Sequence, residues 1–464
     1  MSSQQKEVRN FNPNLVLVVM IVLCTIASYF VTAGAYDRET INGVTRVVAT
    51  SYHETARTPV SIFKMFESIP QGLTGAAMMM FAVMIIGGVV AIYNKTGVMG
   101  AALNSVLKLS NRVGSQMIIA IIALVFMFIG GILGWSEQII PFVPIIISLS
   151  ISLGYDSLVG MAISGFACLI SFAVGPFNIY TVGISHKIAE LPMFSGWGLR
   201  LAVLGVVALS SLFWILRYAA RIKKDPARSL MTDVDTSSLV IPIDESNALD
   251  GAKTVSLIFM GICFGFTVWG LLTQGWSFGE MSAIFLMGGV ATGIVNRMSA
   301  SDICDTIMQG ALAAFGGALI IGLARSVQWV MTQGGLVDPL VHGLTSMMSS
   351  ASSYLTSVFM FIVNFFINAL IPSGSGQAMA VMPIMIPMAD MLHITRQTAT
   401  LAFQFGDGIS NTLWFTNGTL LIYCGLARVS LKKWYRFILP LQAFFFLMQL
   451  AFLYLADAIG YGPM

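Results

Sequence analysis

Long apolar segments repeat along this chain, and they constrain its fold more than any other feature. Many are about 20 residues long, the length that an α-helix needs to cross a hydrocarbon core about 30 Å thick. Hydrophobic residues make up 56% of the 464 residues and charged residues only 10%, whereas a soluble domain carries about 25% charged residues. The sequence therefore predicts an all-α polytopic membrane protein without a separate enzymatic domain.

Nine segments are predicted to be membrane-spanning helices: 14–35, 70–93, 158–186, 197–217, 254–273, 278–296, 309–331, 398–427 and 437–456. Two further apolar stretches, 116–153 and 353–392, are interrupted by small polar residues. The arms of the first are about 15 residues long, which is short for a crossing, so we expect re-entrant hairpins. The stretches 97–112 and 336–349 predict helices that lie at the membrane interface.

The two halves of the chain are related by an internal repeat. A shift of 239 residues aligns them without a gap, and the matched pairs include Ser136 with Ser375, Gln138 with Gln377, Phe166 with Phe405 and Asn178 with Asn417. The extra span at 254–273 reverses the second half, which makes the repeats inverted. Inverted repeats are typical of secondary transporters, whose substrate site lies near the midplane where discontinuous helices meet.

The repeat divides the chain into three parts. We expect a first inverted repeat at 1–218 and a second, with one extra span, at 254–464, each with one hairpin and one broken helix. Basic residues cluster at 217–228 and 428–436, and the positive-inside rule places them, with the linker 219–253, in the cytoplasm. The predicted location is a bacterial inner membrane, with the N-terminus cytoplasmic and the C-terminus periplasmic. The net charge of +3 does not indicate nucleic-acid binding.

Small polar turns interrupt the hairpins near 130–138 and 371–377, and the helices 158–186 and 398–427 are predicted to break at 175–178 and 406–412. Irregular backbone at membrane depth is tolerated only where it is buried in protein or lines a watery cavity. The neutral candidate site residues at these points are Ser136, Gln138, Asn178, Ser373, Gly374, Ser375, Gly376, Gln377, Ser410, Asn411, Thr412 and Asn417. They either satisfy the broken backbone or bind substrate, and their recurrence at matched positions favours binding.

Three charged residues lie at predicted membrane depth: Glu137, Arg325 and Asp407. Each costs at least about 2.5 kcal/mol there if unpaired. One interpretation is an ion pair between Arg325 and either acid. In another, the excess negative charge favours a cationic group on the substrate, as in a basic amino acid. In a third, one carboxylate is protonated in a proton-coupled carrier.

The sequence offers no sign of an enzyme. It contains no Walker-type nucleotide loop, so the energy for transport is expected to come from gradients or exchange. The five cysteines and four histidines are scattered without metal-ligand spacing, and we expect no cofactor and no metal site. A channel and a membrane-embedded enzyme remain competing hypotheses, although no catalytic pair with convincing spacing argues for the latter.

Several of these motifs resemble one known family. The N-terminal pattern 14–34, the Glu137-bearing tip, and the sequences 322–325, 371–377 and 407–412 are similar to the YfcC-type proposed basic amino acid antiporters. These are grouped with the C4-dicarboxylate anaerobic carriers in the ion transporter superfamily. The resemblance covers nearly the whole chain, although the first half has four predicted spans where a fuller superfamily repeat has five.

The resemblance implies a homodimer in the lipid bilayer, with scaffold and transport domains and an elevator-type motion. It implies arginine- or ornithine-type amino acids as the exchanged substrates. The alternative is a proton- or sodium-coupled carrier of C4-dicarboxylates or other small carboxylates. Sequence reasoning thus predicts a small-molecule substrate, with Na⁺ or H⁺ as a coupling ion.

Overall fold

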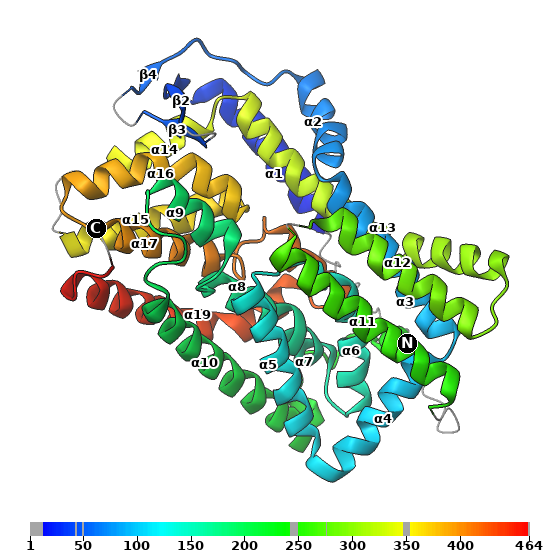
Figure 1. Ribbon diagram of the computed structural model, residues 1–464. Helices are drawn as coiled ribbons and strands as arrows, with labels where there is room; N and C mark the ends of the chain where they lie inside the picture. The colour runs from blue at the N-terminus through cyan, green and yellow to red at the C-terminus, as the bar shows by residue number, and fades with distance from the viewer. Residues whose placement is uncertain are drawn as a thin grey trace, which may run out of the picture.

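The computed structural model describes residues 13–41, 44–48, 51–241, 249–274, 276–346 and 353–462. Helices make up nearly all of this part of the chain, and a few short strands lie at one end (Figure 1). Eight of the described helical segments are long and apolar enough to span a membrane: Ala77–Lys95, Ser115–Leu133, Ser157–Ile188, Trp197–Lys224, Gly251–Gly270, Phe278–Val295, Ala300–Gln333 and Leu431–Ala458. The prediction of a polytopic helical membrane protein is confirmed.

The chain begins with four helices and two small antiparallel sheets. The helices are α1 (Pro13–Phe30), α2 (Ile62–Gly75), α3 (Ala77–Lys95) and α4 (Val98–Val113). Between α1 and α2 lie β1 (Gly34–Ala35), β2 (Arg38–Ile41), β3 (Val44–Val47) and β4 (His53–Glu54), where β1 pairs with β4 and β2 with β3. The segment between α1 and α2 therefore contains short strands. Helix α4 matches the predicted helix 97–112 in extent.

The first predicted hairpin is longer on one side than expected. It consists of α5 (Ser115–Leu133), the 3₁₀ helix η1 (Glu137–Phe142) and α6 (Val143–Ser152). Helix α5 lies between Gly114 and Gly134, both at positive φ, and its 19 residues reach spanning length. Arms of about 15 residues are therefore wrong for α5, because the helix continues to the positive-φ glycine. The re-entrant path of 116–153 stays a prediction.

The first broken helix is interrupted where the sequence predicts. It runs through α7 (Ser157–Met161), the π-helix η2 (Ala162–Phe166) and α8 (Ala167–Val174), and resumes as the π-helix η3 (Ile179–Gly183) and α9 (Ile184–Ile188). Pro176 lacks an N–H for a continuing helix, and the Asn178 side chain caps the next segment. The break at 175–178 is confirmed.

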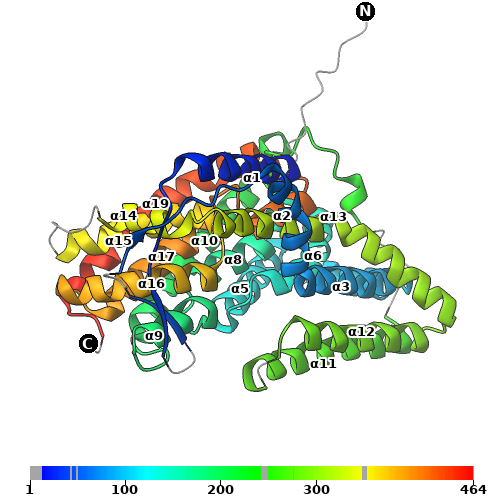
Figure 2. The same ribbon diagram turned by 90° about the horizontal axis from the view of Figure 1, so that it is seen from above.

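Four helices follow in the middle of the chain. They are α10 (Trp197–Lys224), α11 (Gly251–Thr273), α12 (Phe278–Val295) and α13 (Ala300–Gln333), with the short 3₁₀ turns η4 (Pro226–Arg228) and η5 (Ser237–Leu239) after α10. Helix α12 packs against α3, and α11 packs against α12 and α4 at the edge of the molecule (Figure 2). Helix α13 has 34 residues and is much longer than the predicted 309–331.

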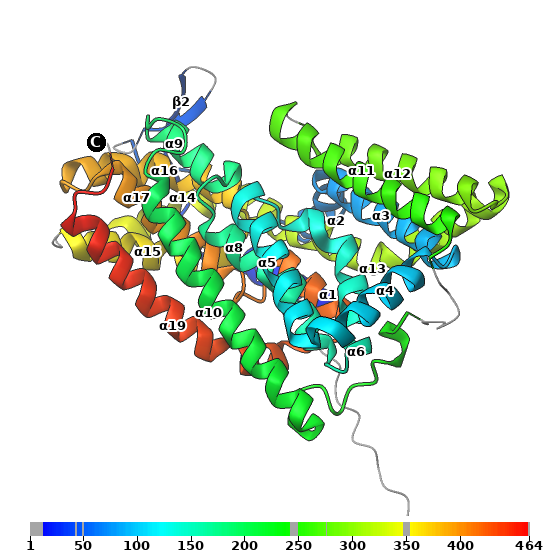
Figure 3. The same cartoon turned by 60° about the horizontal axis from the view of Figure 1, so that its bottom comes forward.

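The last part of the chain contains the second hairpin and the second broken helix. Its elements are α14 (Val337–Ser346), α15 (Ser353–Leu370), α16 (Gly374–Met391), α17 (Arg396–Ser410), α18 (Gly418–Leu426) and α19 (Leu431–Ala458). The interruption predicted at 371–377 is a shorter turn at 371–373, because α16 begins at Gly374. The re-entrant path of 353–392 stays a prediction. Helices α10 and α19 lie side by side along one face, as Figure 3 shows.

The predicted start of the second break is wrong. Helix α17 is continuous through Ser410, so Gly406 and Asp407 lie inside the helix and the break is at 411–417. The glycines serve close packing instead. A Cβ on Gly406 would overlap with Asn364, and one on Gly408 would overlap with the backbone of Ala173. Only glycine allows helix backbones to approach so closely.

Candidate functional site

The two hairpin tips and the second helix break meet around one cavity of about 320 Å³. The predicted residues that line it are Ser136, Glu137, Gln138, Arg325, Ser373, Gly374, Ser375, Asn411 and Asn417. They come from the first tip, the long helix α13, the second tip and the segment between α17 and α18. The volume lies in the range of about 300–1,000 Å³ found for small-molecule pockets. The structure therefore brings together residues that are as much as 281 positions apart in the sequence.

The first tip presents Glu137 to the cavity with hydrogen bonds from both sides. The Ser136 hydroxyl donates to Glu137 Oε2 at 2.7 Å, and the Thr419 hydroxyl donates to Oε1 at 3.3 Å. The Ser136 N–H donates to Gln138 Oε1 at 3.0 Å, and the Tyr423 hydroxyl donates to the Ser136 carbonyl. No described cation lies within ion-pair distance of Glu137. The tip thus fixes a carboxylate that is free to meet a cationic group.

The second tip forms the N-terminus of α16. Ser373 caps this helix, and its hydroxyl accepts a hydrogen bond from the Gly376 N–H at 3.3 Å. The N–H groups in the first turn of a helix have no partners within the helix and carry a partial positive charge. Because Gly374 and Ser375 line the cavity, this helix end can receive a carboxylate there.

The second break also presents a helix N-terminus. Asn417 caps α18 through its side-chain oxygen, which accepts from the Leu420 N–H at 2.9 Å, and its amide donates to Asn411 Oδ1 at 2.8 Å. Asn368 donates to the same Asn411 oxygen at 2.8 Å and to the Ser410 hydroxyl at 2.6 Å. The side chain of Asn411 therefore links Asn368 on α15 to the capping residue Asn417.

Six of the predicted residues do not line the cavity: Asn178, Gly376, Gln377, Asp407, Ser410 and Thr412. Asn178 is buried, and its side-chain oxygen accepts from the Tyr180 N–H at 2.9 Å and the Thr181 N–H at 3.2 Å. Gln377 donates to the carbonyl and side-chain oxygens of Asn364 at 3.0 and 2.9 Å. These two residues hold the backbone of the tips and breaks in place.

Asp407 lies directly behind the second tip and is fully buried. A Cβ on Gly374 would lie 3.3 Å from Asp407 Oδ2 and 2.6 Å from Thr181 Cγ2. Both carboxylate oxygens lack a hydrogen-bond partner among the described residues, as do the buried oxygens Thr181 Oγ1, Asn368 Oδ1 and Gln377 Oε1. A buried carboxylate without a partner is costly, so this position calls for a proton or a cation.

Arg325 faces the cavity from α13 and forms no ion pair with either acid. Its guanidinium donates to Gln328 Oε1 at 2.6 Å, and no described carboxylate oxygen lies within ion-pair distance of it. The interpretation of Arg325 as the partner of Glu137 or Asp407 is therefore not supported by the structure. The guanidinium stays available to an anionic group in the cavity.

Sequence reasoning missed several cavity residues, among them Tyr180, Gln328, Thr419, Met79, Leu169 and Phe172. The repeat contained a signal for two of them. Tyr180 and Thr419 are separated by the same 239 residues as the capping asparagines, and each lies two residues after its cap. Gln328 lies one helical turn after Arg325. The apolar residues carried no sequence signal, because any membrane helix contains many like them.

The family model of the C4-dicarboxylate anaerobic carriers, DcuC, matches residues 14–458. The chain belongs to this family. As a DcuC-family protein it is a multi-pass membrane transporter rather than an enzyme, which confirms that prediction. The family resemblance inferred from the motifs is also confirmed.

Two relatives are similar over most of the chain. A protein of Escherichia coli (strain K12) named "Putative basic amino acid antiporter YfcC" is 28% identical over 413 residues, which cover 85% of this chain and 81% of the relative. An uncharacterised protein of Haemophilus influenzae (strain ATCC 51907 / DSM 11121 / KW20 / Rd) is 28% identical over 382 residues, which cover 81% of this chain and 74% of the relative.

Among solved structures, the similarity extends to Neisseria gonorrhoeae MtrF, which is described within a class of antimetabolite efflux pumps. The two proteins are 16% identical with a TM-score of 0.46, and the match covers 96% of this chain and 95% of MtrF. That likeness is too weak to support an argument.

Proposed function

We propose that this protein is a secondary active antiporter that exchanges basic amino acids of the arginine and ornithine type across the bacterial inner membrane. One observation carries the proposal: Glu137 and Arg325 line the same cavity, yet they form no ion pair with each other. Opposite charges that are held apart offer separate anchors for the cationic side chain and the carboxylate of a basic amino acid. A carrier for a singly charged ion would not need both.

The carboxylate of the substrate has three candidate donors. Arg325 can bind it through two parallel N–H groups, and the N-termini of α16 and α18 reach the same cavity. The cationic side chain has Glu137, which already accepts from two hydroxyl groups and retains capacity for a further donor. This arrangement orients an amino acid between the first tip and α13.

The charge balance favours a substrate or a coupling ion with a positive charge. Glu137, Asp407 and Arg325 together carry one excess negative charge when both acids are ionised. Asp407 does not line the cavity but lies behind Gly374, beside Thr181. Oxygen ligands suit hard cations, and a proton would neutralise the carboxylate equally well. We therefore assign Asp407 to the coupling cation, Na⁺ or H⁺, rather than to the side chain of the substrate.

An elevator-type motion fits the origin of the cavity walls. Gly75, Met79 and Arg325 come from α2, α3 and α13, which pack against one another, while the opposite wall comes from the tips and breaks. In an elevator carrier the second group would form the transport domain and slide along the first. We retain the predicted division into inverted repeats at 1–218 and 254–464, the linker 219–253 and a homodimer as parts of this proposal.

A carrier of C4-dicarboxylates or other small carboxylates is the second candidate. It is favoured by the name of the matching family and by two helix N-termini at one cavity, which could each receive a carboxylate. Glu137 argues against it, because an ionised carboxylate at the first tip would repel a dianion.

Exchange in proteoliposomes tests the two candidates. Radiolabelled arginine should enter vesicles loaded with ornithine, and succinate should not. Glu137→Gln and Arg325→Gln should each reduce arginine exchange at least tenfold, the loss expected for a charge-assisted contact of about 1.5–3 kcal/mol. Glu280→Gln, at an exposed N-terminal turn of α12, removes a carboxylate away from the cavity and serves as the matched control. Succinate uptake without arginine exchange would establish the second candidate instead.

A further inference from the structure

The two basic clusters of the sequence converge on a second, larger cavity. Its volume is about 1,030 Å³, and it lies between the C-terminal end of α10, the turn at 226–233 and the N-terminal end of α19. Its cationic residues are Arg217, Arg221, Arg228, Lys432, Lys433 and Arg436, against the single lining acid Asp233. We call this cavity the basic basin. The positive-inside rule explains why such residues are frequent on one side of a membrane, but it does not explain why segments 200 residues apart in sequence share one cavity.

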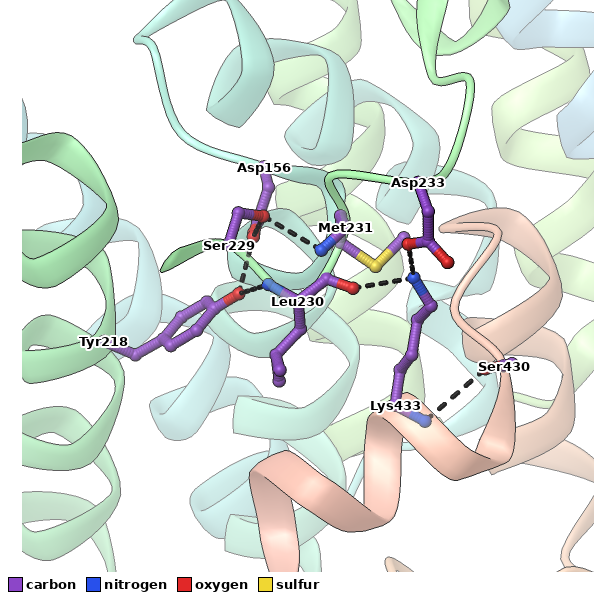
Figure 4. A network of polar contacts seen from close by, with 8 residues as sticks. All are labelled: Asp156, Tyr218, Ser229, Leu230, Met231, Asp233, Ser430 and Lys433. Atoms are coloured by element: carbon purple, nitrogen blue, oxygen red, sulfur yellow. Dashed lines mark hydrogen bonds and ion pairs between the residues drawn. The ribbon is translucent and has the colours of Figure 1, made fainter. Parts of the chain in front are cut away.

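The floor of the basic basin is built by a connected polar network, which Figure 4 shows. Asp156 accepts hydrogen bonds from the Tyr218 and Ser229 hydroxyls, both at 2.6 Å. The Leu230 N–H donates to the Tyr218 hydroxyl at 3.0 Å. The network therefore ties the turn after α10 to α10 itself and to Asp156.

Lys433 joins the same turn to α19. Its ammonium donates to the Leu230 carbonyl at 2.7 Å and forms a close ion pair with Asp233. The Trp214 indole donates to the Phe437 carbonyl at 3.1 Å, which links α10 to α19 below the turn. These contacts hold the walls of the basin at a fixed spacing.

Most of the cations have no acid to neutralise them. Arg228 pairs with Asp225 and Lys433 with Asp233. Arg217, Arg221, Lys432 and Arg436 form no ion pair among the described residues, and their side chains are exposed. Four like charges around one cavity repel one another. A bound anion would remove this repulsion.

The helix surface beside these cations is apolar. This surface indicates that the anion bound in the basic basin also carries an apolar part. On α10, Leu209, Phe213, Arg217 and Arg221 follow one another at four-residue intervals, so they share one face of the helix. Leu209 and Phe213 are 68% and 63% exposed. On α19, Arg436 is followed three residues later by Leu439, which is 50% exposed. Cations that continue into exposed apolar side chains match a phosphate headgroup with its acyl chains.

We propose that the basic basin binds the phosphodiester headgroup of an anionic phospholipid, with its acyl chains along α10 and α19. Basic pockets between membrane helices on the cytoplasmic side bind such headgroups. A lipid bound there would connect α10 to α19, and hence the end of the first half of the chain to the end of the second. This site is separate from the substrate cavity.

Lipid binding to the full-length protein purified in detergent tests the proposal. Fluorescent phosphatidylglycerol should bind more tightly than fluorescent phosphatidylcholine. The double variant Arg221→Gln/Arg436→Gln should bind phosphatidylglycerol about 30-fold more weakly, the loss expected for two cationic contacts. The control Lys108→Gln/Arg112→Gln removes the same charge from exposed positions on α4 and should bind nearly as the wild type does.

Three outcomes would overturn the proposal. These are equal losses in the two double variants, equal binding of both lipids, and displacement of phosphatidylglycerol by millimolar inorganic phosphate, which would assign the basin to a soluble phosphate. If the basin variant does not elute as the wild type in size exclusion, Lys432→Gln replaces it, with an expected loss of about fivefold. Native mass spectrometry that counts bound lipids provides the second measurement.

Discussion

Gly374 at the second tip lies close to the Asp407 carboxylate and to Thr181, which together leave no room for a side chain at position 374. A Cβ at position 374 would lie 3.3 Å from Asp407 Oδ2 and 2.6 Å from Thr181 Cγ2. The second tip, the Asp407 carboxylate of α17 and Thr181, which follows the first break, therefore meet at one point. This contact connects the cavity to the buried acid behind it.

Gly374→Ala should reduce exchange strongly, because the new methyl group would push the tip away from Asp407 and Thr181. We expect at least a tenfold loss of transport rate in proteoliposomes, with protein yield retained. Gly425→Ala is the matched control, since a Cβ there would meet no atom within 4 Å. Equal rates for the two variants would contradict a functional contact at Gly374.

Asp407→Asn should abolish coupling to the cation gradient without selecting among substrates. The carboxylate lies outside the cavity, so cationic and neutral amino acids should lose transport equally, and the dependence of the rate on Na⁺ or pH should flatten. Rates measured with arginine and with a neutral analogue, at several Na⁺ concentrations and pH values, check this. A selective loss of arginine transport would instead place Asp407 at the substrate side chain.

Asn417→Ala and Asn178→Ala should destabilise the protein by similar amounts. Each asparagine caps a helix after a break, and loss of such a cap costs about 0.5–2 kcal/mol. Thermal unfolding in detergent should show lower midpoints for both. Asn94→Ala, at an exposed position near the C-terminal end of α3, is the comparison, because it removes an asparagine that caps no helix N-terminus. A much larger effect at only one of the two caps would contradict their equivalence.

The Lys433–Asp233 ion pair should make stability depend on acidity. The hydrogen bond from Lys433 lowers the pKa of Asp233, so the folded state binds this proton less readily than the unfolded state. The ion pair stabilises the folded protein at pH values above the pKa of an aspartate in the unfolded chain, about 3.9. This stabilisation is lost as the pH falls through the lower pKa of Asp233 in the folded protein. Because the Asp233 side chain is 57% exposed, the ion pair contributes at most about 1 kcal/mol to the free energy of unfolding.

Thermal unfolding of wild type and Asp233→Asn between pH 7 and pH 3 measures this contribution. The wild type should be more stable at pH 7, and the difference between the two proteins should shrink toward pH 3. A difference that is constant over this range would show that the carboxylate charge plays no part.

The sequence was most informative where local chemistry decides the backbone. Pro176 and Asn178 predicted the first break, because proline cannot continue a hydrogen-bonded helix and asparagine caps the next one. The second break was predicted from a glycine-rich stretch and its start was misplaced, because Gly406 and Gly408 allow close helix packing rather than ending a helix. Whether a glycine breaks a helix or packs it depends on its neighbours in space.

Sequence by itself determined that this protein spans a membrane, where the first broken helix is interrupted and which polar residue caps the segment after that break. Hydropathy, proline and capping side chains act within a few residues, so they can be read without the fold. Only the tertiary structure decided that Glu137 and Arg325 share a cavity without pairing, that Asp407 lies behind Gly374, and that two distant basic clusters form one basin. Those relationships depend on distances between residues far apart in the chain, which packing alone sets.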